Sequence, residues 1–145
     1  MIVLDAYALV ALLGDEPAAD AVSAMLGSGG CRISAINLAE AVYVSTSAHG
    51  LEPEDVRDVL VPLILEETLV VDPPGADVAW RAAGLRREHY VKRTSEVSLA
   101  DCFLLAAARP GDAIATADPA VAKVALSEGV ELLGLPDSRG RHPPS

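Results

Sequence analysis

The chain alternates short, mostly apolar runs with longer segments in which apolar residues recur at helical spacing. The apolar runs predict strands at residues 1–4, 31–34, 69–71, 113–115 and 130–133. The segments between them predict helices at residues 6–13, 15–26, 35–48, 52–63, 76–90, 98–108 and 119–128. Glycine or proline separates most of these elements, and we expect Pro62 to kink or shorten its helix.

Strands that alternate with helices predict crossover connections and therefore a fold of the α/β class. Strands that are apolar along their whole length are typical of parallel sheets buried on both faces. We therefore expect one domain over residues 1–135, with a mostly parallel sheet of four to five strands between helix layers. Residues 136–145 include three prolines and no apolar run, so this tail has nothing to bury and is expected to be mobile.

The composition is that of a folded, soluble domain. Apolar residues make up 51% of the 145 residues, which excludes disorder as the main state. No apolar run approaches the ~20 residues that cross a bilayer, so no membrane association is expected. Asp5 interrupts the first apolar stretch and no basic segment precedes it, unlike in a signal peptide. Cys31 and Cys102 have neither metal-binding nor redox spacing, which predicts a reducing, cytoplasmic location.

Charge and aromatic content limit how the chain can bind nucleic acid. The net charge of −10 argues against sequence-independent binding of a nucleic-acid backbone. Aromatic residues make up only 3% of the chain, which argues against base-stacking surfaces of the single-strand-binding type. A basic cluster, opposed only by Glu88, consists of Arg81, Arg86, Arg87, Lys92 and Arg93. This cluster either complements the dipole at a helix C-terminus or contacts phosphates beside a metal site.

Four acidic residues lie where a carboxylate needs a structural or chemical reason. Asp5 follows the first strand within an apolar stretch, where it serves as a helix cap or a ligand. Asp101 follows Ser98 at capping-box spacing, and Asp118 directly precedes a proline at a helix start, so each is first of all a cap. Glu40 lies in the middle of a helix without Lys or Arg. Unless it faces solvent, an unpaired carboxylate there is costly, and this favours a functional role.

Considered together, the four acids predict a metal site. Parallel strands end at one edge of a sheet, so residues that follow them can converge there. Four carboxylates share a pocket only if cations neutralise them, and carboxylate ligands select Mg²⁺ or Mn²⁺. Such clusters most often act on phosphate esters, where the ions activate water and stabilise displacement at phosphorus. Zinc is not expected, because the cysteines lack ligand spacing and the histidines are scattered at His49, His89 and His142.

Four segments carry a family resemblance: Met1–Asp5, Ile33–Glu40, Ser98–Asp101 and Ile114–Asp118. In their order and spacing they resemble the PIN-domain ribonucleases, and most closely the VapC toxins of bacterial toxin–antitoxin pairs. The resemblance covers residues 1 to about 135. One position departs from it, since the chain has Asp5-Ala6-Tyr7 where the family commonly has Asp-Thr-Ser or Asp-Thr-Asn.

The resemblance implies a three-layer α/β/α sandwich that usually forms a homodimer. It implies Mg²⁺- or Mn²⁺-dependent endonuclease cleavage of RNA, such as transfer or ribosomal RNA, and a cognate antitoxin protein that holds the enzyme inactive. The family's acidic quartet, which binds the metal and performs catalysis, maps onto Asp5, Glu40, Asp101 and Asp118. The candidate RNA-binding residues are Arg86, Arg87, Lys92 and Arg93.

Two other classes of protein share parts of this pattern. A receiver-like or phosphatase-like domain also places an Asp after its first strand, but a receiver needs a Lys after a late strand, where this chain has Thr116. A catalytically impaired PIN-like domain that acts as a binding or dimerisation module stays open because of Tyr7. Loss of metal-dependent nuclease activity in an Asp5→Asn variant would separate the enzyme from that module.

Overall fold

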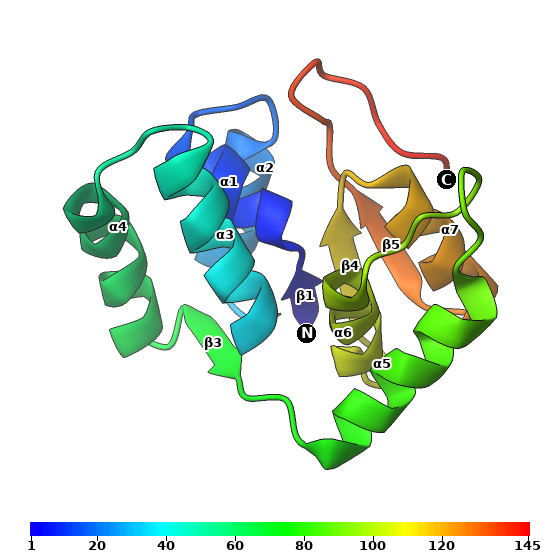
Figure 1. Cartoon of the computed structure of the whole chain (residues 1–145). Coiled ribbons are helices and arrows are strands. Elements are labelled where there is room, and N and C mark those ends of the chain that lie inside the picture. The colour runs from blue at the N-terminus through cyan, green and yellow to red at the C-terminus, as the bar shows by residue number, and fades with distance from the viewer.

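The computed structural model describes residues 1–145 and contains one parallel sheet of five strands in the order β3-β2-β1-β4-β5 (Figure 1). The strands are β1 (Ile2–Leu4), β2 (Cys31–Ser34), β3 (Leu69–Asp72), β4 (Ala113–Thr116) and β5 (Glu131–Gly134). The helices are α1 (Ala6–Leu13), α2 (Ala19–Ser28), α3 (Ala35–Ser47), α4 (Pro53–Leu65), α5 (Ala76–His89), α6 (Leu99–Ala107) and α7 (Pro119–Ser127). None of these helices combines the length and the apolar character that crossing a membrane requires.

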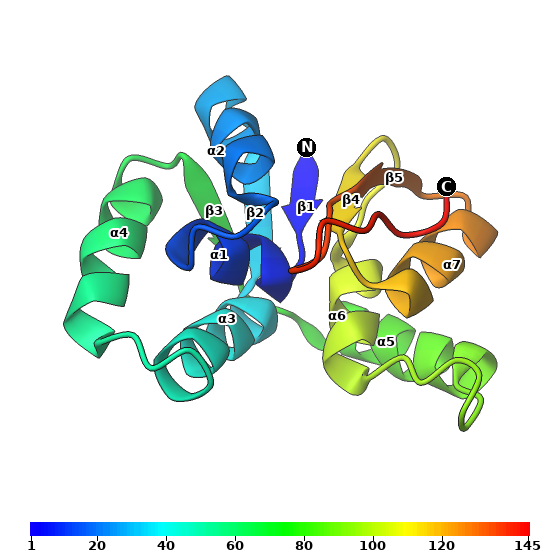
Figure 2. The same ribbon diagram turned by 90° about the horizontal axis from the view of Figure 1, so that it is seen from above.

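A hydrophobic core lies on each face of the sheet, because successive residues of a strand point to opposite sides. Leu4 belongs to the core that α1 to α4 cover, whereas Val3 belongs to the core that α5 to α7 cover. In β4, Ala115 and Ile114 pair in register with these two residues and divide in the same way. In Figure 2, α1 to α4 lie to one side of the central strand β1 and α5 to α7 lie to the other. The α/β/α sandwich expected from the sequence is confirmed.

The strand order creates a crevice beside the central strand β1. The chain leaves β1 for α1, which packs on one face, and leaves the neighbouring β4 for α7, which packs on the other. Connections that diverge from adjacent strands leave a ligand-binding crevice outside the carboxyl ends of those strands. Asp5 follows β1 and Asp118 follows β4 after one residue, so the topology alone places both at this crevice.

A buried ion-pair network holds several strands together. The guanidinium of Arg32 in β2 donates to Asp72 at 2.5 Å, to the carbonyl of Ala107 at 2.7 Å, and to Asp112. Asp112 also accepts a hydrogen bond from the N-terminal ammonium of Met1 at 2.8 Å. The network therefore ties the N-terminus to β2, the end of β3 and the start of β4. Arg32 was not among the predicted functional residues, and the only feature that sets it apart in the sequence is its position as a lone charge in a short strand.

The helices differ from the predicted ones in two places. The second helix begins at Ala19 rather than at Asp15, because Asp15 adopts a φ of 50° and the chain turns before the helix starts. The fourth helix continues past Pro62 to Leu65, so the proline does not shorten it. Local signals for helix boundaries are therefore correct only to within a turn at these points.

The C-terminal segment makes contacts that were not expected from its composition. Pro143 is buried and packs against Gly134. Asp137 accepts hydrogen bonds from the backbone N–H groups of Arg139 and Arg141, both at 2.9 Å. The expectation that this segment has nothing to bury is wrong, because a tight turn around Asp137 folds it back on the domain. The mobility of residues 136–145 stays a prediction.

Candidate active site

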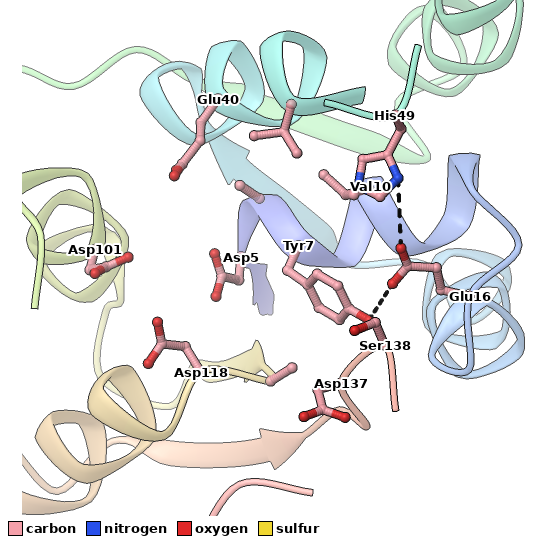
Figure 3. A pocket seen from close by; sticks show the side chains of 13 residues that line it. Asp5, Tyr7, Val10, Glu16, Glu40, His49, Asp101, Asp118, Asp137 and Ser138 are labelled. Carbon is pink, nitrogen blue, oxygen red and sulfur yellow. Dashed lines mark hydrogen bonds and ion pairs between the residues drawn. The ribbon is translucent and has the colours of Figure 1, made fainter. Parts of the chain in front are cut away.

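One cleft at the carboxyl edge of the sheet is lined by all four acids that the sequence pointed to (Figure 3). The cleft has a volume of about 430 Å³, and its acidic end is formed by Asp5, Glu40, Asp101 and Asp118. They come from the ends of β1 and β4 and from the helices α3 and α6. Figure 3 shows the four side chains directed toward one shared space. The convergence predicted from the sequence is therefore present in the fold.

Asp5 is the most buried of the four acids, and a threonine holds it in place. The hydroxyl of Thr116 donates to Asp5 Oδ2 at 2.5 Å and accepts the N–H of Asp118 at 3.0 Å. Burial is the main cause that raises the pKa of Asp5 to about 7; the negative charges of Asp101, Asp118 and Glu40 add to the rise, and the hydrogen bond from Thr116 opposes it. Ionised Asp5 therefore needs nearby positive charge.

Two of the acids also cap the N-termini of helices: Asp118 that of α7, and Asp101 that of α6. Asp118 accepts the backbone N–H of Ala120 at 2.7 Å. Asp101 accepts the N–H of Ser98 at 2.7 Å, while the Ser98 hydroxyl accepts the N–H of Asp101 at 3.0 Å, which completes a capping box. Burial raises the pKa of Asp101 although these hydrogen bonds oppose the shift. Capping and lining the cleft are thus combined in the same side chains.

Glu40 reaches the cleft from the middle of α3. One turn earlier, the fully buried Asn37 donates its side-chain amide to the carbonyl of Ala100 at 3.2 Å, which fastens α3 to α6. No Lys or Arg occurs on α3, so Glu40 has no basic partner on its own helix. Burial, followed by the negative charge of Asp101, raises the pKa of Glu40.

The chemistry of these donors fits a hard divalent cation. Four carboxylates line the acidic end of the cleft, and neither Lys nor Arg lines any part of it. Burial is the main cause that raises the pKa values of Asp5, Glu40 and Asp101, and the negative charges of neighbouring acids add to the rise. Carboxylate oxygens are the ligands that Mg²⁺ and Mn²⁺ prefer, whereas zinc sites usually include nitrogen or sulfur. The residues present therefore match the ions that the sequence predicts.

The other end of the cleft consists of residues that the sequence analysis did not assign to a site. The hydroxyl of Tyr7 donates to Glu16 Oε2 at 2.6 Å, and His49 Nδ1 lies 4.0 Å from Glu16 Oε1. Asp137 and Ser138 of the C-terminal segment complete this end. The sequence could have indicated Tyr7, because this residue departs from the family pattern. It could not have indicated Glu16, because the position of Glu16 at the cleft depends on the unpredicted turn before α2.

The basic cluster is not part of the cleft lining. Arg86 is partly buried, donates to the carbonyl of Val97 at 2.7 Å, and lies with its guanidinium 3.9 Å from the centroid of the Tyr90 ring. This residue therefore has a structural role in fastening α5 to the segment before α6. The other candidates for RNA binding are solvent-exposed at the end of α5 and in the turn that follows it: Arg87, Lys92 and Arg93. Their contact with RNA stays a prediction.

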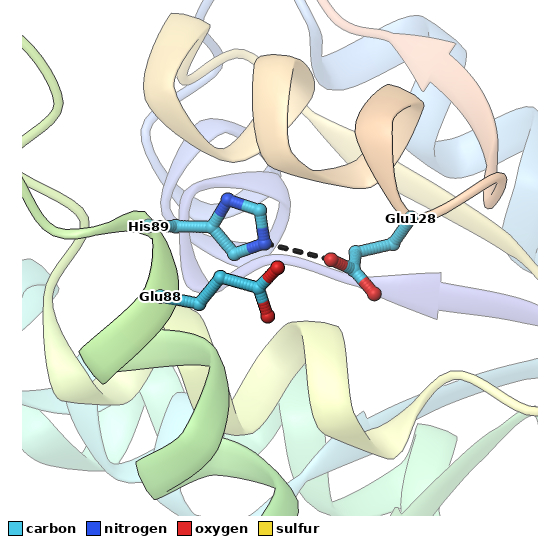
Figure 4. Close-up of side chains that lie close together, drawn as sticks. All are labelled: Glu88, His89 and Glu128. Atoms are coloured by element: carbon cyan, nitrogen blue, oxygen red, sulfur yellow. Dashed lines mark hydrogen bonds and ion pairs between the residues drawn. The ribbon is translucent and has the colours of Figure 1, made fainter.

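A separate group of metal-ligating side chains lies where α5 and α7 end (Figure 4). His89 Nε2 lies 2.7 Å from Glu128 Oε1, and one ligand atom each of Glu88, His89 and Glu128 falls within 4.8 Å of the other two. The histidines are scattered in the sequence, yet the fold brings one of them to two acids. Because both acids are exposed and His89 already pairs with Glu128, we assign no function to this group.

The sequence matches the PIN domain family over residues 2–127. Because the match spans most of the chain, the protein belongs to the PIN domain family. The resemblance of the four sequence segments to the PIN domain family is thereby confirmed. A comparison with curated proteins gives no match.

Several solved structures have a fold similar to that of this chain. A toxin–antitoxin complex from Klebsiella pneumoniae is 19% identical with a TM-score of 0.58, covering 81% of this chain and 87% of that chain. FitAcB from Neisseria gonorrhoeae is 23% identical with a TM-score of 0.61, covering 92% and 96%. VapBC2 from Rickettsia felis, bound to a promoter DNA fragment, is 19% identical with a TM-score of 0.59, covering 92% and 98%. These similarities establish the fold.

Proposed function

We propose that this protein is a Mg²⁺- or Mn²⁺-dependent endoribonuclease that hydrolyses phosphodiester bonds of RNA and acts as the toxin of a toxin–antitoxin pair. The observation that carries the proposal is the meeting of Asp5, Glu40, Asp101 and Asp118 in one cleft without Lys or Arg. Membership of the PIN domain family supports a nuclease. The resemblance of the four sequence segments to VapC toxins supports the role as a toxin.

The four acids would hold the cation and divide the remaining tasks between them. When bound, Mg²⁺ or Mn²⁺ supplies charge neutralisation, an acidic water, and stabilisation of charge on the phosphate oxygens. Asp5, fixed by Thr116, forms the buried base of the cleft, while Asp101 and Asp118 are fixed by their helix caps. Glu40 caps no helix, so its carboxylate is free to bind the cation or to accept the proton of an attacking water.

The resemblance to toxins of toxin–antitoxin pairs also suggests the partners of this protein. Two of the structures with this fold, FitAB at 22% identity and a TM-score of 0.63 and VapBC2, are bound to DNA fragments. We propose a cognate antitoxin as the protein partner of this chain, a homodimer as its own assembly, and the cytoplasm as its location, since RNA is the substrate. Growth arrest on expression, relieved by the protein encoded in the neighbouring reading frame, would identify the antitoxin. Sedimentation of the purified protein at twice the 15.0 kDa chain mass would establish the dimer.

The test of the nuclease is cleavage of labelled RNA by the wild type and by Glu40→Gln, with Mg²⁺, with Mn²⁺ and with a chelator. We expect cleavage that requires either ion and is lost in Glu40→Gln, while the thermal melting point of the metal-free variant is equal or higher because one repulsive charge is removed. Glu66→Gln, an exposed acid at the end of α4, is the matched control and should cleave normally.

The competing function is a catalytically impaired PIN-like domain that acts as a binding or dimerisation module. Tyr7 favours it, since it replaces the small polar residue common in the family. Wild-type protein that cleaves no RNA with either ion, yet binds RNA or a second copy, would establish this module instead. A large loss of stability in Glu40→Gln would show that Glu40 serves the fold rather than the reaction.

A further inference from the structure

We propose that the outer end of the cleft, formed by Tyr7, Glu16 and His49, binds the nucleobase next to the cleaved phosphate and favours bases with an exocyclic amino group. The proposal rests on the proposed nuclease function and adds which part of the RNA this end recognises. Adenine, cytosine and guanine carry such an amino group, whereas uracil does not. The outer end would therefore select against uracil at one position of the substrate.

The first observation is a fixed aromatic ring beside the acids. Tyr7 lies two residues after Asp5 and is the only Phe, Tyr or Trp residue that lines the cleft. Its hydroxyl is held by Glu16 at 2.6 Å, so the ring is already oriented before any ligand arrives. Figure 3 shows the ring between the acidic end and the outer end. Unpaired RNA bases stack on such rings, and one stacked base changes affinity by roughly 5- to 150-fold.

The second observation is the charge of the outer end, which suits a base and not a phosphate. Glu16 and Asp137 are acidic, and no Lys or Arg lines the cleft. The Asp137 carboxylate already accepts hydrogen bonds from the backbone N–H groups of Arg139 and Arg141 and from the guanidinium of Arg141. Glu16 accepts one hydrogen bond from Tyr7 and keeps further acceptor capacity. A carboxylate with free acceptor positions reads amino groups at a base edge.

The third observation is that both ends belong to one continuous cleft. Its volume of about 430 Å³ lies within the roughly 300–1,000 Å³ of small-molecule sites. Val10 and Val44 add apolar surface at its wall, which favours the faces of a base. A single nucleotide can thus place its phosphate at the acids and its base at Tyr7. One ring makes one base subsite, which agrees with an aromatic content too low for an extended stacking surface.

The test measures nucleotide preference and binding together. A set of short RNAs that differ only in the base beside the cut is cleaved with Mn²⁺, and non-cleavable versions containing 2-aminopurine report binding by fluorescence. We expect Tyr7→Leu to raise KM and the Kd of the non-cleavable RNA by roughly 5- to 150-fold, with a small change in kcat. Tyr7→Phe should keep the affinity, since the ring stays, and weaken the preference, since the hydrogen bond that positions the Glu16 carboxylate is lost. Glu16→Gln should make uracil as acceptable as the other bases.

The controls separate this proposal from the proposed function. Tyr43→Leu removes a tyrosine of α3 that is 70% exposed and does not line the cleft, so it should leave the Kd and the preference unchanged. Wild type that cleaves RNA, together with Tyr7→Leu and Glu16→Gln variants of unchanged KM and unchanged preference, would overturn the base subsite while the nuclease function stands. A wild type that neither cleaves nor binds RNA would overturn both.

Discussion

Asp5 carries a large electrostatic cost in the metal-free cleft, because it is buried and three other carboxylates face it. Its pKa is about 7 in the folded protein, against a usual value of 3.8. The folded state therefore binds a proton more tightly than the unfolded state does. By linkage, the free energy of unfolding decreases as the pH rises from about 4 to about 7, by something on the order of 4 kcal/mol for this group.

We predict that Asp5→Asn removes this pH dependence. Asparagine can still accept the Thr116 hydrogen bond and carries no charge. With a chelator present, the variant should exceed the wild type in stability by about 4 kcal/mol at pH 8 and by less than about 1 kcal/mol at pH 4, as measured by urea unfolding. Mg²⁺ should raise the melting point of the wild type at pH 8 much more than that of the variant. Equal pH profiles for both proteins would contradict the prediction, and the exposed Asp58→Asn on α4 serves as the control.

At the level of single residues, the sequence identified the acids but not their surroundings. Glu40 was predictable because nothing on its own helix neutralises it, and that argument needs no tertiary structure. Thr116 and Glu16 were not, since their roles depend on the register of β4 against β1 and on the turn before α2. Contacts of this kind join residues far apart in the chain, and local patterns do not encode them.

At the level of elements, the five strands were predictable because short apolar runs bounded by turn-forming residues are typical of buried strands and are too short for helices. The order of the strands was not predicted, and it is the order that places Asp5 beside Asp118. The contacts of the C-terminal segment were missed for a related reason. Pro143 packs against Gly134 at the end of β5, and this contact depends on the position of β5 in the sheet.

The ion-pair network around Arg32 shows how these elements are fastened together. Arg32 bridges Asp72, which ends β3, and Asp112, which precedes β4. Burial opposes ionisation of Asp112, but hydrogen bonds from the N-terminal ammonium, Arg109 and Arg32 prevail and lower its pKa to about 2. This depressed pKa means that Asp112 stabilises the fold above about pH 4 and loses that contribution as the pH falls toward 2.

We predict that Arg32→Met lowers the free energy of unfolding by about 3–5 kcal/mol at pH 7, since it leaves the buried Asp112 with less compensating charge. Arg109→Ala is the matched control, because that side chain is 68% exposed and lies 3.7 Å from Asp72. It should cost less than about 1 kcal/mol. Chemical denaturation at pH 7 measures both. Adding Asp112→Asn to Arg32→Met should recover part of the loss, and a further loss of the same size would contradict the network.

At the level of the whole molecule, a net charge of −10 and a cleft without Lys or Arg oppose a polyanionic substrate. Positive charge near the cleft entrance must therefore help RNA to approach. Lys92 and Arg93 are exposed in the turn between α5 and α6, and α6 carries Asp101 in its first turn. Arg86 is engaged with Val97 and Tyr90, which leaves it less able to contact a phosphate.

We predict that the double variant Lys92→Ala and Arg93→Ala weakens RNA binding without changing metal binding. Each phosphate contact that is lost should reduce the slope of log K against log salt by about one. The measurement is a titration of RNA into Asp5→Asn protein, which isolates binding from cleavage, over a range of salt concentrations. Arg57→Ala is the matched control, since Arg57 is exposed on α4, which Figure 2 shows at the opposite end of the molecule from α5. If the double variant keeps the affinity and the slope of the control, the two side chains form only a solvated turn, and another surface attracts the RNA.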